Sequence, residues 1–173
     1  KSVLSKSSWL SDLNTKIKVS DLNRNNIARV TQLFNKTNQL NLSTRRLSQE
    51  EIKDWNSKKQ NKILNFSVSD SFGDLGLVGI VGYSIKGKTA LINDFILSCR
   101  AMGREIEKSM IYVVIGDILN KEISRIEAIF YPTKRNRPTL DVLNNLKIEE
   151  IKDNHFTIDT DSRLFKPKYT QII

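Results

Sequence analysis

The hydrophobic and polar positions along the chain follow two different periods, and the clearest example is the stretch from residue 89 to residue 120. Residues 90–97 are apolar on both faces except for Asn93 and Asp94, which predicts a strand buried in the middle of a sheet. After a short turn that contains Gly103, apolar residues return with helical spacing. The predicted unit is a buried strand, a glycine-containing turn and a helix whose inner face carries Ile106, Met110, Val113, Val114 and Ile118.

Other segments follow the same two patterns. Residues 15–19 alternate polar and apolar side chains, which is typical of a strand with one exposed face. Ser48-x-x-Glu51 is a capping box, so a short helix is predicted to begin there. Further helices are predicted at about 25–35 and 139–146, and further strands at 63–68, 77–85, 125–131, 149–151 and 156–158. The predicted order is β, α, α, β, β, β, α, β, α, β, β.

The two ends of the chain differ in pattern from the part between them. Residues 1–14 are rich in serine, and we interpret them as a linker, as the end of an upstream region or as a short packed helix. Residues 15–160 contain all the predicted strands and helices and form the predicted domain. Residues 161–173 have little regular pattern and are predicted to be a C-terminal tail. The chain begins at Lys1 without methionine, so we expect it to be a fragment of a longer protein.

Composition places the chain among ordinary globular proteins. Its 173 residues are enough for one domain, which would bury roughly 70% of its unfolded surface. A hydrophobic content of 39% and a charged content of 27% are typical of such a domain. No apolar run approaches the roughly 20 residues of a membrane span, and no signal peptide is evident. We therefore expect no membrane partner.

Charge and the two rarest reactive residues exclude several classes of site. The formal net charge is +9, but the basic residues form no long block or tail, so we predict no nucleic-acid partner. Cys99 is the only cysteine and His155 the only histidine. One chain therefore has neither a disulfide framework nor a Cys/His metal site, and no metal is predicted. A lone thiol fits a cytoplasmic protein.

The turn after the buried strand has the features of a phosphate-binding site. A helix that begins near Ile106 leaves backbone N–H groups unpaired and carries partial positive charge at its start. Arg100 and Arg104 add formal charge, and Gly103 lets a ligand approach the backbone closely. The alternative interpretation is an ordinary strand-to-helix turn with solvated arginines, and the spacing alone does not decide between the two.

A second polar stretch, residues 36–46, is dense in amide, hydroxyl and guanidinium groups. Such groups hydrogen-bond a polar ligand. The same side chains also cap neighbouring helices when the stretch is simply a polar loop. Composition alone favours the polar loop.

The turn resembles a motif of a known superfamily. Arg100-x-x-Gly103-Arg104-x is similar to the pyrophosphate-binding turn of the GNAT acyltransferases, Gln/Arg-x-x-Gly-x-Gly/Ala. Glu105 departs from the pattern, because it brings a carboxylate to the position of the last glycine or alanine.

Longer segments resemble one particular family. Residues 36–46, residues 95–104 and the pattern from Phe72 to Gly79 are similar to the C-terminal, GNAT-like region of FkbH-like proteins. Those proteins join a HAD-type phosphatase-like domain to this region. The family loads a glyceryl unit onto an acyl carrier protein in polyketide and related pathways.

The resemblance implies an α/β fold of the GNAT type in residues 15–160, with a mixed, mostly antiparallel central sheet flanked by helices. It implies coenzyme A or a carrier-protein phosphopantetheine thioester as cofactor, and an acyl carrier protein and an upstream HAD-type domain as partners. The implied cofactor-binding residues are Leu97 and Ser98, through their backbone groups, and Arg100, Gly103, Arg104, Glu105, Ile106 and Asn136. The implied substrate-binding residues are Asn38, Gln39, Asn41, Thr44 and Arg45, with Arg45 or Arg46 facing a carboxylate or phosphate.

The proton donor departs from what the resemblance implies. Many GNAT enzymes use a tyrosine on the last helix, and this chain has Leu143 at the matching position, which gives no proton. This departure counts against standard acetyl transfer, or favours another donor such as Cys99 or Tyr131. Asp94 is the best placed carboxylate for a general base. The alternative for Cys99 is a small buried residue, and for His155 a structural role.

Three functions stay open at this point. The first is the acyl-transfer domain of an FkbH-like enzyme, and the second is a non-catalytic domain that docks the carrier protein. The third is a stand-alone N-acyltransferase that uses acyl-coenzyme A. Asp159-Thr160-Asp161 is too close to the C-terminus for a HAD-type motif, so phosphate cleavage is predicted to belong to another domain.

Overall fold

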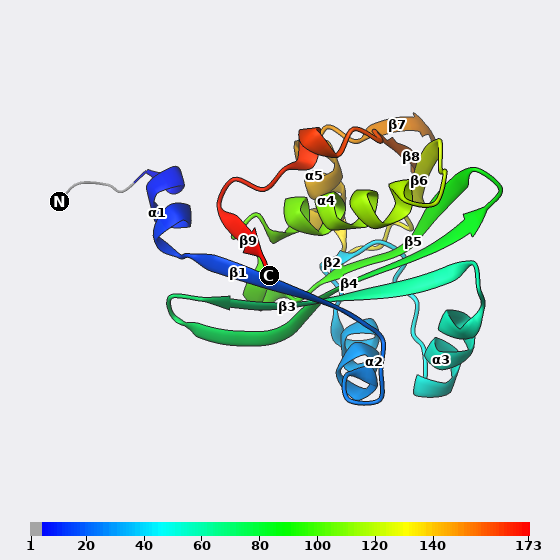
Figure 1. The fold of residues 1–173 in the computed structure, drawn as a ribbon, viewed down its shortest axis with the longest axis horizontal. Coiled ribbons are helices and arrows are strands. Elements are labelled where there is room, and N and C mark those ends of the chain that lie inside the picture. The colour runs from blue at the N-terminus through cyan, green and yellow to red at the C-terminus, as the bar shows by residue number, and fades with distance from the viewer. Residues whose placement is uncertain (1–4) are drawn as a thin grey trace.

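A computed structural model describes residues 5–173 and contains one long sheet with helices on both of its faces (Figure 1). The strands are β1 (Thr15–Asp21), β2 (Leu40–Asn41), β3 (Asn61–Asp70), β4 (Gly73–Lys86), β5 (Thr89–Leu97), β6 (Arg125–Ile129), β7 (Glu149–Lys152), β8 (His155–Ile158) and β9 (Thr170–Ile172). The α-helices are α1 (Lys6–Asp12), α2 (Ile27–Lys36), α3 (Gln49–Ser57), α4 (Ile106–Leu119) and α5 (Arg137–Asn145). Two short 3-10 helices are η1 (Cys99–Ala101) and η2 (Ser162–Phe165).

The sheet is mixed and mostly antiparallel, as predicted. Its strands lie in the order β7-β8-β6-β5-β4-β3-β1-β9, and β2 pairs with β5 beside this path. The pairs β5–β6 and β1–β9 are parallel, whereas the other pairs in the described chain are antiparallel. Every predicted helix and strand is present, and the capping box of Ser48 and Glu51 begins α3 with both of its hydrogen bonds.

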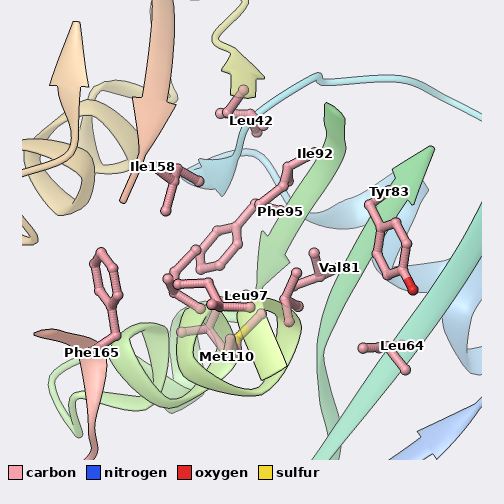
Figure 2. Packing of buried hydrophobic residues seen from close by; sticks show 14 of the residues in the cluster. Leu42, Leu64, Val81, Tyr83, Ile92, Phe95, Leu97, Met110, Ile158 and Phe165 are labelled. Carbon is pink, nitrogen blue, oxygen red and sulfur yellow. The ribbon is translucent and has the colours of Figure 1, made fainter. Parts of the chain in front are cut away.

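Two hydrophobic clusters, one on each face, hold the helices to the sheet. Helices α2 and α3 cover one face, and α4 and α5 cover the other (Figure 1). Strand β5 contributes to both clusters because its side chains alternate, so that Ile96 faces α2 while Phe95 and Leu97 face α4. Figure 2 shows Phe95 and Leu97 facing Met110 of α4 and Phe165 of η2. This double burial explains why the β5 sequence is apolar on both faces.

The C-terminal segment is more ordered than its sequence pattern indicates. Residues 161–173, which we expected to be an irregular tail, contain η2 and β9. Phe165 is 3% exposed and packs in the cluster beneath α4, and β9 pairs with β1 through Thr15–Thr170 and Ile17–Ile172. A three-residue strand is too short to show a period, so the pattern of residues 161–173 contains no signal for β9. At the other end, Leu10 and Leu13 are buried, which agrees with a short packed helix.

Two further features of residues 5–173 bear on function. None of the described helices is long and apolar enough to cross a bilayer. Among the same residues, no three histidine, cysteine, aspartate or glutamate side chains gather into a group that would hold a metal ion.

Candidate functional site

Strands β5 and β6 run side by side for only part of their length. Thr89–Ile92 of β5 pairs with residues 125–128 of β6, and the two strands then diverge. The divergence coincides with a β-bulge: Gly82 of β4 faces Asp94, Tyr83 faces Ile92, and Asn93 is the extra residue. A bulge bends its strand and re-aims the side chains next to it.

Strand β2 fills the gap that this divergence opens. Leu40 and Asn41 pair with Leu97 and Ile96 of β5. The Leu42 N–H donates to the Phe95 carbonyl over 3.0 Å, and the Tyr131 N–H donates to the Leu42 carbonyl over 3.0 Å. The segment 40–42 therefore bridges β5 and the end of β6 with backbone hydrogen bonds on both sides.

Three buried polar side chains hold β2 in this position. Thr139 Oγ1 accepts from the Asn41 N–H over 2.9 Å and donates to the Gln39 carbonyl over 3.0 Å. Asn136 Nδ2 donates to the Asn41 carbonyl over 3.0 Å and to the Tyr131 carbonyl over 2.9 Å. Asn41, Asn136 and Thr139 are all fully buried. We call these three residues the β2 latch.

The structure gives the other predicted substrate-binding residues local partners as well. The Thr44 N–H donates to Asn41 Oδ1 over 2.8 Å, and Thr44 has a left-handed backbone with φ of +55°. Asn38 Oδ1 accepts from the Arg46 guanidinium. Gln39 is exposed. These contacts satisfy the backbone of a tight connection, which is the polar-loop interpretation of residues 36–46.

Arg45 and Asp94, predicted separately as substrate ligand and general base, form one partly buried ion pair. Arg45 Nε donates to Asp94 Oδ1 over 3.0 Å, and its Nη2 donates to Oδ2. Ser43 Oγ also donates to Oδ1, over 2.6 Å. The Asp94 side chain is fully buried, and the Arg45 guanidinium stacks 5.3 Å from the ring centre of Trp55. The two carboxylate oxygens of Asp94 are both engaged by these three donors, so this arrangement favours a positioning role for Asp94.

In the predicted phosphate turn, the space beside Gly103 is free, whereas one of the two arginines already binds a carboxylate of the protein. Gly103 is exposed with φ of +82°, and no atom lies within 4 Å of the place where a Cβ would be. Arg100 is exposed, but Arg104 Nε donates to Asp70 Oδ2 over 2.8 Å. Burial raises the pKa of Asp70, but the hydrogen bonds from Arg104 and from the Phe72 and Gly73 backbone, together with the charge of Arg104, lower it more. The folded carboxyl therefore has a pKa below its ordinary value.

Carboxylates crowd the start of α4. Glu105 precedes the helix with a left-handed φ of +57°, and its side chain lies 3.8 Å from Lys6 Nζ. Glu107 Oε2 is buried and has no hydrogen-bond partner within residues 5–173. Burial, and after it the charge of Glu105, raise the pKa of Glu107. Ile106 points into the core. A phosphate at this turn would meet Gly103 and Arg100 on one side and Glu105 on the other.

A groove of about 990 Å³ includes Gly103 in its lining. It runs between the first turn of α4, the C-terminal end of α5 and the segment 157–165. Its lining contains both basic and acidic side chains. The basic ones are Lys6, Lys108, Arg125 and Lys147, and the acidic ones are Glu105, Glu107, Glu149 and Asp159. A ligand held at Gly103 would extend into this groove.

Comparisons with known proteins were made by sequence and by structure. No protein-family model and no curated protein matches the sequence. Among solved structures, a domain from Methanocaldococcus jannaschii DSM 2661 matches with a TM-score of 0.62 at 15% identity, covering 83% of this chain and 96% of that one. A GNAT-family acetyltransferase from Staphylococcus aureus MU50 matches with a TM-score of 0.61 at 13% identity, covering 82% and 96%. The chain has the GNAT fold.

A third match, the aminoglycoside acetyltransferase AAC(6')-Ib in complex with coenzyme A, agrees with this assignment. Its TM-score is 0.60 at 8% identity, and the match covers 84% of this chain and 96% of that one. The GNAT fold predicted from the Arg100–Glu105 turn is thus confirmed. The closer resemblance to FkbH-like proteins stays a prediction, because the structural matches share too little sequence to test it.

Within this GNAT fold, the candidate proton donors differ in access. Leu143, at the position of the usual tyrosine, is buried. Cys99 is exposed on η1, so the alternative of a small buried cysteine does not fit the structure. Tyr131 is 54% exposed and lies just beyond β6. His155 is paired with Glu127 at 2.9 Å across β6 and β8.

The sequence did not predict two features of the site, namely the protein partners of the backbone at the end of β5 and the bulge at Asn93. The backbone of Leu97, expected to pair with a pantetheine arm, pairs instead with Leu40 on one side and Gly79 on the other. The Ser98 N–H, expected in the same role, donates to the Val78 carbonyl over 2.8 Å. In the sequence pattern, Asn93 is only an interruption of an apolar strand. That interruption is the one signal for the bulge that the sequence contains.

Proposed function

We propose that the chain is the GNAT-like domain of an FkbH-like protein and that it binds a phosphopantetheine thioester, on coenzyme A or on an acyl carrier protein. In that role it assists the transfer of a glyceryl-type acyl unit. The observation that supports this most directly is the open Gly103 turn, which joins the bulged strand β5 to α4 and lines the large groove. In the GNAT resemblance, this turn holds the pyrophosphate.

Such a transfer forms one bond, breaks one bond and moves two protons. The acceptor attacks the thioester carbonyl, a new bond to the acyl carbon forms, and the carbon–sulfur bond breaks. The acceptor loses one proton and the leaving thiolate gains one. Tyr131 carries an exposed hydroxyl just beyond the end of β6, which makes it our candidate for the proton to the thiolate. Cys99 is the second candidate, because its thiol is also accessible.

A second function, docking of the carrier protein without turnover, is favoured by two observations. Strand β2 covers the edge of β5 along which a pantetheine arm was expected to lie, and Leu143 replaces the usual tyrosine with a buried apolar side chain. In this version the domain presents the thioester to an upstream HAD-type domain, and the acyl group stays on the carrier.

A third function, stand-alone N-acylation, is favoured only by the names of structural neighbours. These include a spermidine N-acetyltransferase from Vibrio cholerae, with a TM-score of 0.55 at 14% identity over 82% of this chain and 90% of that one. Turnover of acetyl-coenzyme A with an amine would support this function.

Calorimetry with coenzyme A and with a phosphopantetheinylated carrier protein tests the proposal. Gly103→Trp is expected to abolish binding. The space next to Gly103 is open, since no atom lies within 4 Å of an added Cβ, and the indole would fill the space that the ligand needs. Gly87→Trp is the matched control, since Gly87 also has a positive φ and open space but lies in the β4–β5 turn. Binding that both variants keep, or that the wild-type protein lacks, would contradict the proposal.

Mass analysis of the carrier separates the catalytic version from the docking version. A glyceryl-loaded carrier is incubated with the domain and with a nucleophile such as a free thiol. Loss of the acyl group at a rate above the uncatalysed one indicates catalysis. Tight binding with an intact thioester indicates docking.

A further inference from the structure

His155 and Glu127 form a pair on a part of the sheet that α2 and α3 leave open. Nε2 of His155 on β8 lies 2.9 Å from Oε2 of Glu127 on β6. Their sequence neighbours Ile126, Ala128 and Phe156 belong to the cluster beneath α4, so the pair faces the other side of the sheet. The cluster beneath α2 and α3 includes no described residue of β6 or β8. The pair is therefore accessible, with 32% of the His155 side chain and 16% of the Glu127 side chain exposed.

A small hollow of about 190 Å³ lies next to this pair, where β5 and β6 diverge. Ile129 lines the hollow and pairs directly with His155, and Leu91 also lines it and pairs directly with Glu127. Directly paired residues of neighbouring strands place their side chains on the same face, in antiparallel pairs with Cβ atoms about 4.5–5.5 Å apart. The pair therefore borders the hollow on the same face of the sheet. The other lining residues are Ser43, Arg45, Ile92, Asn93 and Tyr131.

The contact with Glu127 decides which nitrogen of His155 is free. A carboxylate only accepts hydrogen bonds, so Nε2 carries the ring proton and donates it to Oε2. The other carboxylate oxygen, Oε1, lies 3.5 Å from Arg125 Nη1. Within residues 5–173, Nδ1 of His155 makes no hydrogen bond, so its lone pair is available. A histidine that a carboxylate orients, with its second nitrogen free, has the arrangement of a general base.

We propose that His155 is the general base for the acyl acceptor and that Glu127 is its positioning residue. Asp94 leaves this role open, because both of its oxygens are engaged. Nδ1 of His155 takes the proton of an acceptor placed over the hollow while the acceptor atom forms its bond to the thioester carbonyl carbon. The carbon–sulfur bond breaks, the thiolate takes a proton from solvent, directly or through Tyr131, and His155 returns its own proton to solvent. This role rests on the catalytic version of the proposed function.

Deacylation of the glyceryl-loaded carrier, with dithiothreitol as the acceptor thiol, tests the base. Mass analysis follows the loss of the acyl group above the uncatalysed rate. His155→Gln should lower kcat by about 10²–10⁴-fold, the usual contribution of a general base. A His155→Gln variant that keeps the wild-type rate, or a wild-type protein that does not accelerate the reaction, would overturn the proposal.

Nitrogen NMR tests the positioning role, because His155 is the only histidine of the chain. The neutral ring should carry its proton on Nε2 in the wild type, a measurement that needs no variant. A glutamine amide donates to Nε2, so Glu127→Gln should move the proton to Nδ1 and lower kcat by more than about tenfold with little change in KM. Glu127→Asp should restore part of the loss, and Glu122→Gln, which changes an exposed carboxylate before β6, should match the wild type. A wild-type proton on Nδ1, or an unchanged kcat in Glu127→Gln, would contradict the role of Glu127.

Calorimetry of coenzyme A and carrier binding on the same samples separates this inference from the proposed function. His155→Gln should bind both ligands as the wild type does, because the pair borders the hollow and does not line the groove beside Gly103. Binding with turnover that survives in His155→Gln would overturn the inference and leave the proposed function standing. Binding without any turnover by the wild type would overturn the inference and leave only the docking version. A wild-type protein that binds neither ligand would overturn the proposed function itself.

Discussion

At the scale of single residues, a glycine makes room for the ion pair of Arg45 and Asp94. Gly82 of β4 faces Asp94 across the sheet, and a Cβ at Gly82 would lie 2.9 Å from Asp94 Oδ2 and 3.5 Å from the Trp55 ring. The sequence pattern shows Asp94 as a polar interruption of β5. It does not show that Asp94 meets Gly82, because the contact joins two strands across a bulge whose register no periodicity reveals.

We expect Gly82→Ala to destabilise the protein by about 1–3 kcal/mol, because the added methyl group must push the Asp94 carboxylate away from Arg45. Chemical denaturation measures the change. Gly116→Ala is the control, since a Cβ at this exposed position of α4 meets nothing within 4 Å. Alanine there should stabilise the helix by about 0.5–1 kcal/mol. A Gly82→Ala variant as stable as the control would show that the carboxylate can shift freely.

At the scale of elements, the connection between α2 and α3 is built into the sheet as β2. The polar residues that drew attention in the sequence, Asn41 and Asn136 among them, hold this short strand in place. The sequence favoured a polar loop by composition, and that interpretation explains most of the contacts. It could not show which backbone the amides would bind, since Asn41 and Thr139 are 98 residues apart.

Thr139→Val tests whether the β2 latch holds the strand. Valine keeps the shape of threonine but leaves the buried Asn41 N–H unpaired, which should cost about 1–3 kcal/mol. Hydrogen exchange should become faster at the amides of Leu42 and Tyr131, which bridge to β5 and β6 through this segment. Thr31→Val is the control, because the Thr31 hydroxyl only donates to a carbonyl within α2. Unchanged exchange at both amides in Thr139→Val would show that β2 does not depend on the latch.

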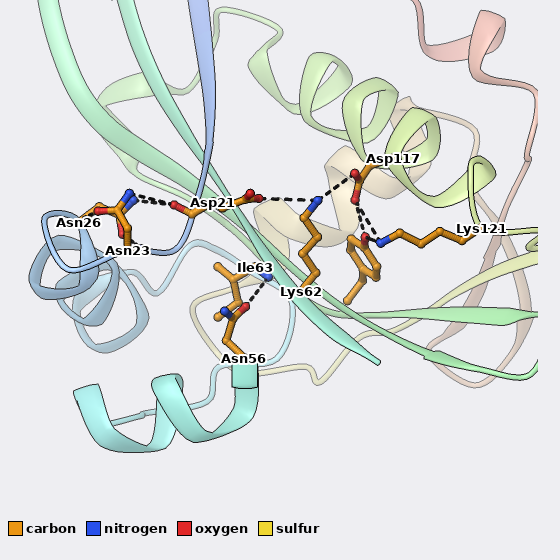
Figure 3. Close-up of polar contacts among 9 residues, drawn as sticks. Asp21, Asn23, Asn26, Asn56, Lys62, Ile63, Asp117 and Lys121 are labelled. Atoms are coloured by element: carbon orange, nitrogen blue, oxygen red, sulfur yellow. Dashed lines mark hydrogen bonds and ion pairs between the residues drawn. The ribbon is translucent and has the colours of Figure 1, made fainter. Parts of the chain in front are cut away.

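A second element-scale feature is the polar network that ties α4 to β3 and β4 (Figure 3). Asp117 of α4 accepts from Lys62 Nζ over 2.9 Å and from the Tyr83 hydroxyl, and Lys121 Nζ donates to that hydroxyl. Burial raises the pKa of Asp117, but the hydrogen bonds from Tyr83 and Lys62 and the charges of Lys62 and Lys121 together lower it more, to below 3.8. Burial and Asp117 raise the pKa of Tyr83 well above its ordinary value.

This network predicts how stability depends on acid. Because the folded pKa of Asp117 lies below its ordinary value of 3.8, the carboxylate stabilises the fold above that pH and the effect is lost as the pH falls through the folded pKa. The melting temperature of the wild type should therefore drop more between neutral pH and the region below 3.8 than that of Asp117→Asn. Asp141→Asn, which changes an exposed carboxylate on α5, should behave as the wild type. Equal drops in Asp117→Asn and the wild type would refute this assignment.

At the scale of the whole molecule, the order of the long helices and strands was predictable from the sequence. The short strands that complete the sheet were not. Long segments with a clear period, such as β5 and α4, were identified because burial on both faces leaves a continuous apolar run. Two pieces without a period complete the sheet, namely β2 in its middle and β9 at its edge. Both are short and owe their conformation to distant backbone partners, which a local pattern does not contain. Of the candidate site, the Gly103 turn was predicted, but the occupied edge of β5 was not.

The C-terminal segment offers a test of how far the domain extends. Phe165 is 3% exposed, and Leu164 next to it is 57% exposed. We expect Phe165→Ala to cost about 3–5 kcal/mol of unfolding free energy, and Leu164→Ala to change it by less than about 0.5 kcal/mol. Thermal and chemical unfolding of the two variants measures the difference. A small loss for Phe165→Ala would mean that residues 161–173 are an appendage to the domain.

The pairing of β9 with β1 has a consequence for how the chain reaches its native state. The β3–β4–β5 meander is built from neighbouring segments, whereas β1 and β9 join residue 15 to residue 170. Contacts so distant in sequence close late in folding, because the chain entropy of a large loop must be lost first. Until β9 arrives, the outer edge of β1 presents unpaired backbone groups, which are a template for another molecule's strand. Refolding at high protein concentration should therefore give aggregates, and adding a peptide of residues 168–173 should reduce them by covering that edge early.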